Sequence, residues 1–222
     1  MPREARIKGD DLTYHVLTRG NNKMTAFHDD EDYLKYYDII RKYKRSIPFE
    51  LYHFCLMSNH PHLLIKPNFD ISRLMHRVNL SYAQYYKRRY KHIGHFWQDR
   101  FKSYIVSQDE YMLRCARYIE TNPERTISKT PPEAYPYSSY RYYAFGEKCD
   151  MLTENPLYKD FGNTPDERKK NYIMFIKERG VDQDLIKPKS QFIASQEYIN
   201  KLLNTLKLKR KRRGRPRKIG LN

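Results

Sequence analysis

The sequence is poor in cysteine, and this scarcity excludes two common ways of stabilising a protein. Three cysteines, Cys55, Cys115 and Cys149, stand far apart among the 222 residues, and no C-x-x-C pair occurs. A disulfide framework has an even number of cysteines and a thiolate zinc site has closely spaced ones, so we expect neither. Because Cys55 and Cys115 lie in apolar surroundings, we interpret them as small core residues.

Long hydrophobic runs are also missing. No apolar stretch approaches the ~20 residues that a membrane-spanning helix needs. The stretch MPREARIKGDD at the start contains no apolar segment of the kind found in signal peptides. We therefore expect a cytoplasmic protein without a membrane partner.

Acidic residues are outnumbered by basic ones. The 26 Asp and Glu residues face 43 Lys and Arg residues, which gives a formal net charge of +17. An excess of this size predicts a polyanionic partner, with nucleic acid as the first choice and an anionic membrane surface as the second. For a bacterial-type protein, the first choice implies association with the nucleoid.

The pattern of apolar residues predicts an α+β fold. Hydrophobic residues make up 39% of the chain and Tyr alone fills 21 positions, so Tyr and Phe must supply much of the core. Alternation and helical spacing, with turn residues between, predict strands and helices in the order strand, helix, strand, strand, helix, strand, helix. In that order they span residues 14–17, 31–45, 49–57, 62–65, 73–91, 101–106 and 111–122, with Ser72 as cap of the second helix. The first six elements match a ferredoxin-like antiparallel sheet with helices on one face.

The composition changes after about residue 124. A stretch rich in Pro, Ser and Tyr precedes two further predicted helices, one behind the capping box Thr164–Glu167 and one starting at Ser195. Nine of the twelve residues 207–218 are basic. We therefore divide the chain into a main domain (1–145), a mainly helical extension (146–206) and a basic tail (207–222).

The segment MSNHPHLLIKP contains the first candidate site. Residues two apart on a strand point to the same face, so His60 and His62 could together bind one metal ion and leave coordination positions open. Taken alone, an H-x-H pair is more often one surface and one core histidine. Pro61 between them suits an edge or the start of a strand.

A second candidate lies on the predicted helix 111–122. Tyr118 and Asn122 are four residues apart and so share one face of the helix. If that face packs beside the histidine strand, Asn122 could supply an oxygen ligand and Tyr118 a hydroxyl near a metal-held substrate. A tyrosine on an amphipathic helix is otherwise most often a core residue.

Four motifs follow one another along the chain: YHVLTRGNNK, MSNHPHLLIKP, GHFWQDRFKS, and RYIETNP followed by SSY. In this order they resemble one family, the HUH-type single-tyrosine transposases, and within it the REP-associated tyrosine transposase branch. The resemblance implies that His60, His62 and Asn122 bind Mg²⁺ or Mn²⁺ and that Tyr118 is the nucleophile. Imidazole suits manganese or zinc better than magnesium, so Zn²⁺ is a further possible occupant. Pro61 departs from the bulky hydrophobic residue of the family.

This resemblance implies an enzyme that nicks and joins single-stranded, hairpin-forming DNA. Tyr118 would attack the phosphate in line, leaving a 5′-phosphotyrosine and a free 3′-hydroxyl. The alternatives are a non-catalytic regulator that binds DNA hairpins on the same fold and, more distantly, a relaxase or replication initiator. The sequence leaves open whether the protein is a monomer or a homodimer.

Candidate DNA-binding residues combine positive charge with aromatic rings, which can contact phosphates and stack on unpaired bases. In the tail, RRGRPRK resembles an AT-hook, whose arginine enters the minor groove of A·T tracts. A nonspecific electrostatic anchor would look the same in sequence. The expected DNA contacts are Arg88, Arg89, Trp97, Arg100 and Lys102 in the main domain and Arg213, Arg215 and Arg217 in the tail.

Overall fold

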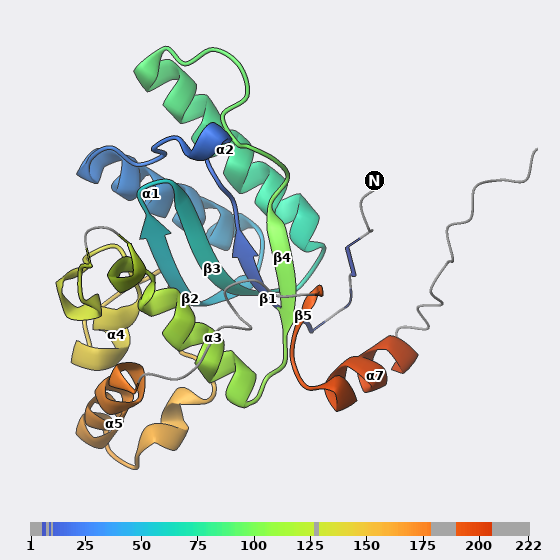
Figure 1. Cartoon of the computed structure of the whole chain (residues 1–222), viewed down its shortest axis with the longest axis vertical. Helices are drawn as coiled ribbons and strands as arrows, with labels where there is room; N and C mark the ends of the chain where they lie inside the picture. The colour runs from blue at the N-terminus through green and yellow to red at the C-terminus, as the bar shows by residue number, and fades with distance from the viewer. Residues whose placement is uncertain (1–5, 8, 10, 127–128, 179–189, 206–222) are drawn as a thin grey trace, which may run out of the picture.

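A five-stranded sheet in the order β2-β3-β1-β4-β5 forms the centre of the computed structural model, which describes residues 6–7, 9, 11–126, 129–178 and 190–205 (Figure 1). Neighbouring strands are antiparallel except β4 and β5, which run parallel. The order of the first four strands confirms the predicted α+β, ferredoxin-like fold. The strands are β1 (Thr13–Leu17), β2 (Phe49–Met57), β3 (His60–Pro67), β4 (Lys102–Val106) and β5 (Phe192–Ile193).

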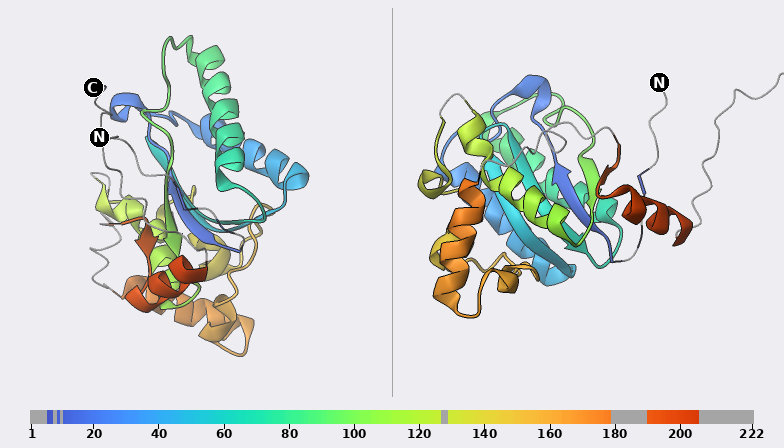
Figure 2. Two further views of the ribbon diagram at one scale, coloured as in Figure 1. Left: turned by 90° about the vertical axis from the view of Figure 1, so that its right-hand side faces the viewer. Right: turned by 60° about the horizontal axis from the view of Figure 1, so that its bottom comes forward.

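Two long helices, α1 and α2, cover one face of this sheet (Figure 2). They bury an apolar layer to which β1 contributes Tyr14 and Val16 and β3 contributes Leu63 and Ile65. Much of the layer is aromatic, as the composition predicts; Tyr36 and Tyr82, for example, are fully buried. The two helices are α1 (Asp30–Ser46) and α2 (Ile71–Tyr90).

Aspartates begin both of these helices. The Asp29 side chain accepts a hydrogen bond from the Asp32 backbone N–H at the start of α1. At the start of α2 the cap is Asp70, which accepts from the backbone N–H of Ser72 at 2.8 Å, so the prediction that Ser72 is the cap is wrong by two residues. An aspartate satisfies the free N–H groups of a first turn and also favours its positive dipole.

The third helix, α3 (Glu110–Glu120), crosses the opposite face of the sheet, in front of it in Figure 1. Its apolar side, which includes Met112, Cys115 and Ile119, packs on Cys55 of β2 and Leu64 of β3. The expected placement of helices on one face thus holds for α1 and α2, while α3 packs on the other face. Tyr118, which belongs to α3, therefore lies on that other face.

The β2–β3 hairpin turns at Ser58 and Asn59, as predicted, and the strand β3 begins at His60 rather than at His62. Pairing with β1 ends at His62, which lies opposite Leu17. Pro61 therefore lies beyond the residues of β3 that pair with β1. Because proline has no backbone N–H, this position costs β1 no hydrogen bond. The proline is compatible with a regular strand through both histidines.

Segments from the C-terminal part cover both edges of the sheet (Figure 1). Beside β2, residues 137–139 and Thr153 form backbone hydrogen bonds with this strand. At the other edge β5, which was not predicted, pairs with β4. Among the described residues, no helix is long and apolar enough to cross a membrane. The further helices are α4 (Tyr140–Phe145), α5 (Pro165–Lys177), which has the predicted capping box, and α7 (Gln196–Thr205).

Candidate active site at the end of the sheet

Three histidines meet where β1 ends and β3 begins. His15 lies on β1 and faces the α3 side, as His62 does on β3. The Nε2 atom of His15 and the Nδ1 atom of His62 are 2.9 Å apart, and their rings stack with centroids 5.2 Å apart. His60 lies next to His62, with ring centroids 4.7 Å apart. The predicted pair is therefore a cluster of three.

All three imidazoles are neutral at neutral pH. Burial lowers the pKa of His15 to about 3 and the pKa of His60 to about 4, and the Arg19 guanidinium also acts to lower the pKa of His60. Burial also holds the pKa of His62 well below its ordinary value, assisted by His60, His15 and Arg19. The neutral form is the one that binds a metal ion.

The free ring nitrogens of this cluster indicate where a ligand would bind. His62 uses Nδ1 on His15, while its buried Nε2 atom has no hydrogen-bond partner among the described residues. The Nδ1 atom of His60 likewise forms a hydrogen bond, with the side-chain oxygen of Asn59. In metal sites one imidazole nitrogen usually binds a protein group while the other binds the metal. Both histidines fit this pattern.

Tyr118 approaches the same cluster from α3. Its ring lies edge-on to His15 and to His62, with centroids 5.8 Å apart in each case, and its side chain is 8% exposed. Burial raises the pKa of the Tyr118 phenol, while the charge of Arg125 and the Asn122 amide act to lower it. The predicted packing of this helix beside the histidine strand is therefore what the structure contains.

Asn122 is buried just beyond the end of α3. Its Nδ2 atom donates to the backbone oxygens of Tyr118 at 2.7 Å and Ile119 at 3.3 Å, so its amide closes the last turn of the helix. This geometry uses the nitrogen and leaves the amide oxygen as the group that could face a metal. Its role as a ligand remains a prediction.

The donor set fits a divalent cation that also takes oxygen ligands. Within the described ranges, no three His, Cys, Asp or Glu side chains are placed to hold a metal ion. Two neutral imidazoles would leave open positions for an amide oxygen, water or a phosphate oxygen. Such a mixed, incomplete set is typical of catalytic sites rather than of structural ones.

His15 was missed in the sequence interpretation. Its signal is alternation, because Tyr14 and Val16 on either side of it face the apolar core, so His15 must face the other way. This alternation does not show which strand lies beside β1. The contact with His62 depends on the β1–β3 register, which pairs His15 with Leu64 and Leu17 with His62.

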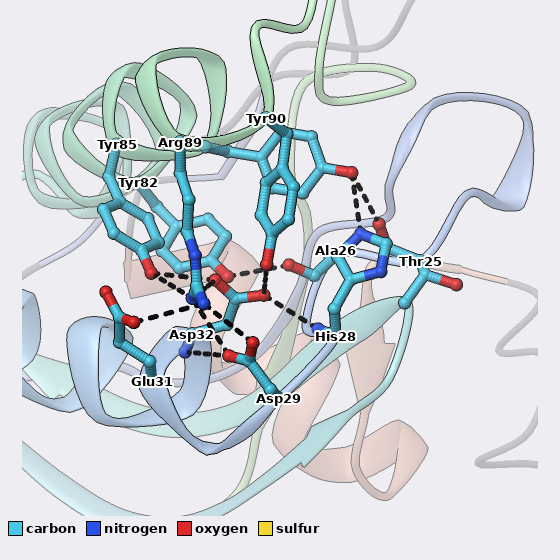
Figure 3. Close-up of polar contacts among 11 residues, drawn as sticks. Thr25, Ala26, His28, Asp29, Glu31, Asp32, Tyr82, Tyr85, Arg89 and Tyr90 are labelled. Carbon is cyan, nitrogen blue, oxygen red and sulfur yellow. Dashed lines mark hydrogen bonds and ion pairs between the residues drawn. The ribbon is translucent and has the colours of Figure 1, made fainter.

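Arg89, one of the expected DNA contacts, is engaged inside the protein (Figure 3). Its guanidinium forms ion pairs with Asp29, Glu31 and Asp32 and a hydrogen bond with the Tyr85 hydroxyl. The cluster joins the last turn of α2 to the first turn of α1. Three carboxylates compensate the positive charge, which argues against a phosphate contact at this residue.

The other expected contacts in the main domain lie on α2, in the loop after it and at the start of β4. Trp97 donates from Nε1 to the backbone oxygen of Asn79 at 2.9 Å and packs at the rim of the core, half-buried. Arg100 and Lys102 are exposed, and so is Arg88. Trp97 and Arg100 line a groove of about 1030 Å³ between α2 and residues 95–101. The tail residues Arg213, Arg215 and Arg217 lie outside the described residues.

Comparisons with known proteins bear on the fold and the family of this chain. No curated protein sequence matches the chain. A solved structure of a REP-associated tyrosine transposase bound to a REP hairpin is similar in fold, with a TM-score of 0.57 at 18% identity over 69% of this chain and 94% of that one. The family described as IS200-like transposases matches residues 8–122, more than half of the chain. The chain belongs to the IS200-like transposase family.

Proposed function

We propose that this protein nicks and rejoins single-stranded, hairpin-bearing DNA through a covalent 5′-phosphotyrosine at Tyr118. The observation that carries the proposal is the packing of the Tyr118 ring against both His15 and His62. A tyrosine hydroxyl beside neutral imidazoles that can hold a cation is the combination that transesterification at phosphorus needs. Family membership supports the same class of reaction.

DNA is the proposed partner on two grounds. The net charge of +17 favours a polyanion. The REP-associated transposase of similar fold is bound to a REP hairpin, and we extend that class of ligand to this chain. Arg100 and Trp97, in the groove beside α2, are candidates for contacts outside the reacting centre.

We assign Mg²⁺ or Mn²⁺ to His60, His62 and Asn122. When bound, such a cation would neutralise charge that develops on the phosphate oxygens. His15 fixes the orientation of His62 through the hydrogen bond between their ring nitrogens. The histidines need no proton removed at neutral pH, because burial already keeps them neutral.

The reaction needs no external energy source. The Tyr118 oxygen bonds to phosphorus while the bond from phosphorus to the 3′ oxygen breaks, and the phenolic proton ends on the released 3′-hydroxyl. The phosphotyrosine retains the energy of the phosphodiester, so attack by a 3′-hydroxyl reverses the step and rejoins strands. Because burial raises the pKa of Tyr118, its proton must leave during the attack rather than before it.

The test is an adduct assay with a matched control. Labelled single-stranded DNA from the genomic flanks is incubated with protein and Mn²⁺ and run on a denaturing gel. We expect an adduct with the wild type and none with Tyr118→Phe. Tyr104→Phe is the control, because the ring of Tyr104 also lies near His15, with centroids 6.1 Å apart, and this variant should still form the adduct. An adduct that persists in Tyr118→Phe would show that another residue is the nucleophile. A wild type that binds the DNA without an adduct would favour the hairpin-binding regulator.

A further inference from the structure

An arginine lies over the face of the proposed nucleophile. The guanidinium carbon of Arg125 is 5.0 Å from the centroid of the Tyr118 ring. Arg125 comes from the short 3-10 helix η2 (Asn122–Arg125) that follows α3, and its side chain is exposed while the ring beneath it is buried. The ring face attracts the cation and so limits where the guanidinium can lie.

Arg125 differs from Arg89 in how its charge is compensated. Arg89 also stacks on a tyrosine, Tyr90 at 5.2 Å, but three carboxylates hold it. Arg125 forms no ion pair with any residue that the structure describes. Its five N–H donors therefore remain available to an anion.

The charges around the histidines and Tyr118 point to the same kind of ligand. Arg19 follows β1 and is exposed, and its charge acts on His60 and His62. Arg125 acts on Tyr118 from the other element. The permanently charged groups that act on the cluster are therefore both cationic, one from the end of β1 and one from η2. Such a site attracts a phosphate before any metal ion is counted.

We propose that Arg125 is a catalytic residue that binds the scissile phosphate across the face of the Tyr118 ring and stays bound to it in the phosphotyrosine. The inference rests on the proposed function and adds a substrate contact that the histidines and Asn122 do not provide. A guanidinium can donate two parallel hydrogen bonds to two phosphate oxygens, which fixes the phosphorus for in-line attack. Arg125 forms no covalent bond and loses no proton in the step.

The first measurement is the single-turnover rate of adduct formation by full-length protein. We expect Arg125→Gln to slow it by about 100-fold to 1,000-fold, as for loss of one preorganised donor to a developing charge, and Arg125→Lys to restore part of the rate. Arg114→Gln is the matched control, because Arg114 stacks on Tyr111 at 5.1 Å, a tyrosine outside the site. Equal rates for wild type and Arg125→Gln would overturn the proposal.

A second measurement separates contact with phosphate from mere support of the ring. One non-bridging oxygen of the scissile phosphate is replaced by sulfur, and both diastereomers are assayed. If Arg125 contacts that oxygen, sulfur at one of the two positions slows the wild type more than it slows Arg125→Gln. Identical sulfur effects in both proteins, for both diastereomers, would show that Arg125 does not touch the phosphate. Failure of the proposed function looks different, because the wild type would then form no adduct with normal DNA.

Discussion

The two faces of the central sheet differ in what their buried polar atoms do. On the α1–α2 face, the fully buried Tyr82 donates its hydroxyl to the backbone oxygen of Ala26 at 2.7 Å. On the α3 face, His15 and His62 contact each other while Nδ1 of the first and Nε2 of the second have no partner in the described part of the chain. Native cores leave few such atoms unpaired. The Tyr36 hydroxyl on the α1–α2 face also lacks a partner among the described residues, so the number of unpaired atoms does not separate the faces. What separates them is chemistry, because the unpaired atoms under α3 are imidazole nitrogens beside Tyr118 that can bind a ligand.

One strand serves both faces because its side chains alternate. On β3, His62 points toward Tyr118 while the next residue, Leu63, enters the apolar core under α1 and α2. Both side chains are buried, to 3% and 1% exposure. Neighbouring positions with equal burial thus have different roles, so burial alone does not identify the site.

The largest expected effects come from substituting these two neighbours. Leu63→Ala should lower the free energy of unfolding by about 2–5 kcal/mol through the cavity it leaves, while folded protein still forms the DNA adduct. His62→Ala should abolish the adduct and lower the free energy of unfolding by about 1–3 kcal/mol, because it leaves the buried Nε2 atom of His15 without its partner. Denaturant unfolding and adduct yield are measured for both variants.

Similar stability and similar adduct yield in the two variants would contradict the difference between the two faces. A His62→Ala protein that still forms the adduct in chelator would remove the histidine from the chemistry. A Leu63→Ala protein that is stable yet inactive would place a functional role on the core face.

Much of the main domain follows from sequence periodicity. Alternation and turn residues predicted the β2–β3 hairpin, and helical spacing predicted α1, α2 and α3. The strand β5 was missed, because Phe192–Ile193 is too short to show a period and forms only by pairing with β4. Residues far apart in the chain, such as His15 and Tyr118, were not joined because sheet register is a property of the whole fold.

The next effect, of moderate size, tests the polar cluster that joins α1 to α2. Asp32 is fully buried and its carboxylate accepts hydrogen bonds from Arg89, Tyr85 and Tyr90 (Figure 3). Asp32→Asn should lower the free energy of unfolding by about 2–4 kcal/mol, since it removes the charge that Arg89 needs. Adduct formation by the folded protein should not change.

Asp38→Asn is the control for this cluster. Asp38 lies on the same helix and pairs with Arg41, but its side chain is 64% exposed. Its loss should change stability by only about 0.5 kcal/mol. Equal unfolding curves for the two variants would show that the cluster adds no stability to this face.

The effect that is smallest per pH unit is a pH dependence of stability that arises on the α3 face. Burial depresses the pKa of His15 from 6.5 to about 3, so between these values the unfolded chain binds a proton that the folded protein excludes. Its stabilising contribution is complete above the unfolded pKa and is lost as pH falls through that window. The slope is at most about 1.4 kcal/mol per pH unit for each such histidine.

His15→Phe should flatten this slope. Urea unfolding is followed across the window in chelator, so that no metal competes with protons. The wild type should lose stability on acidification faster than the variant does. Parallel curves would mean that His15 takes up its proton equally in the folded and unfolded states.

The most direct test of the central claim is to locate the bond itself. The protein–DNA adduct is digested with protease and nuclease, and mass spectrometry identifies the peptide that carries the remaining nucleotide. Attack by Tyr118 should leave a 5′-phosphoryl linkage on the Tyr118 oxygen and a free 3′-hydroxyl on the released strand. A nucleotide on any other residue, or a linkage through the 3′ end, would contradict this mechanism.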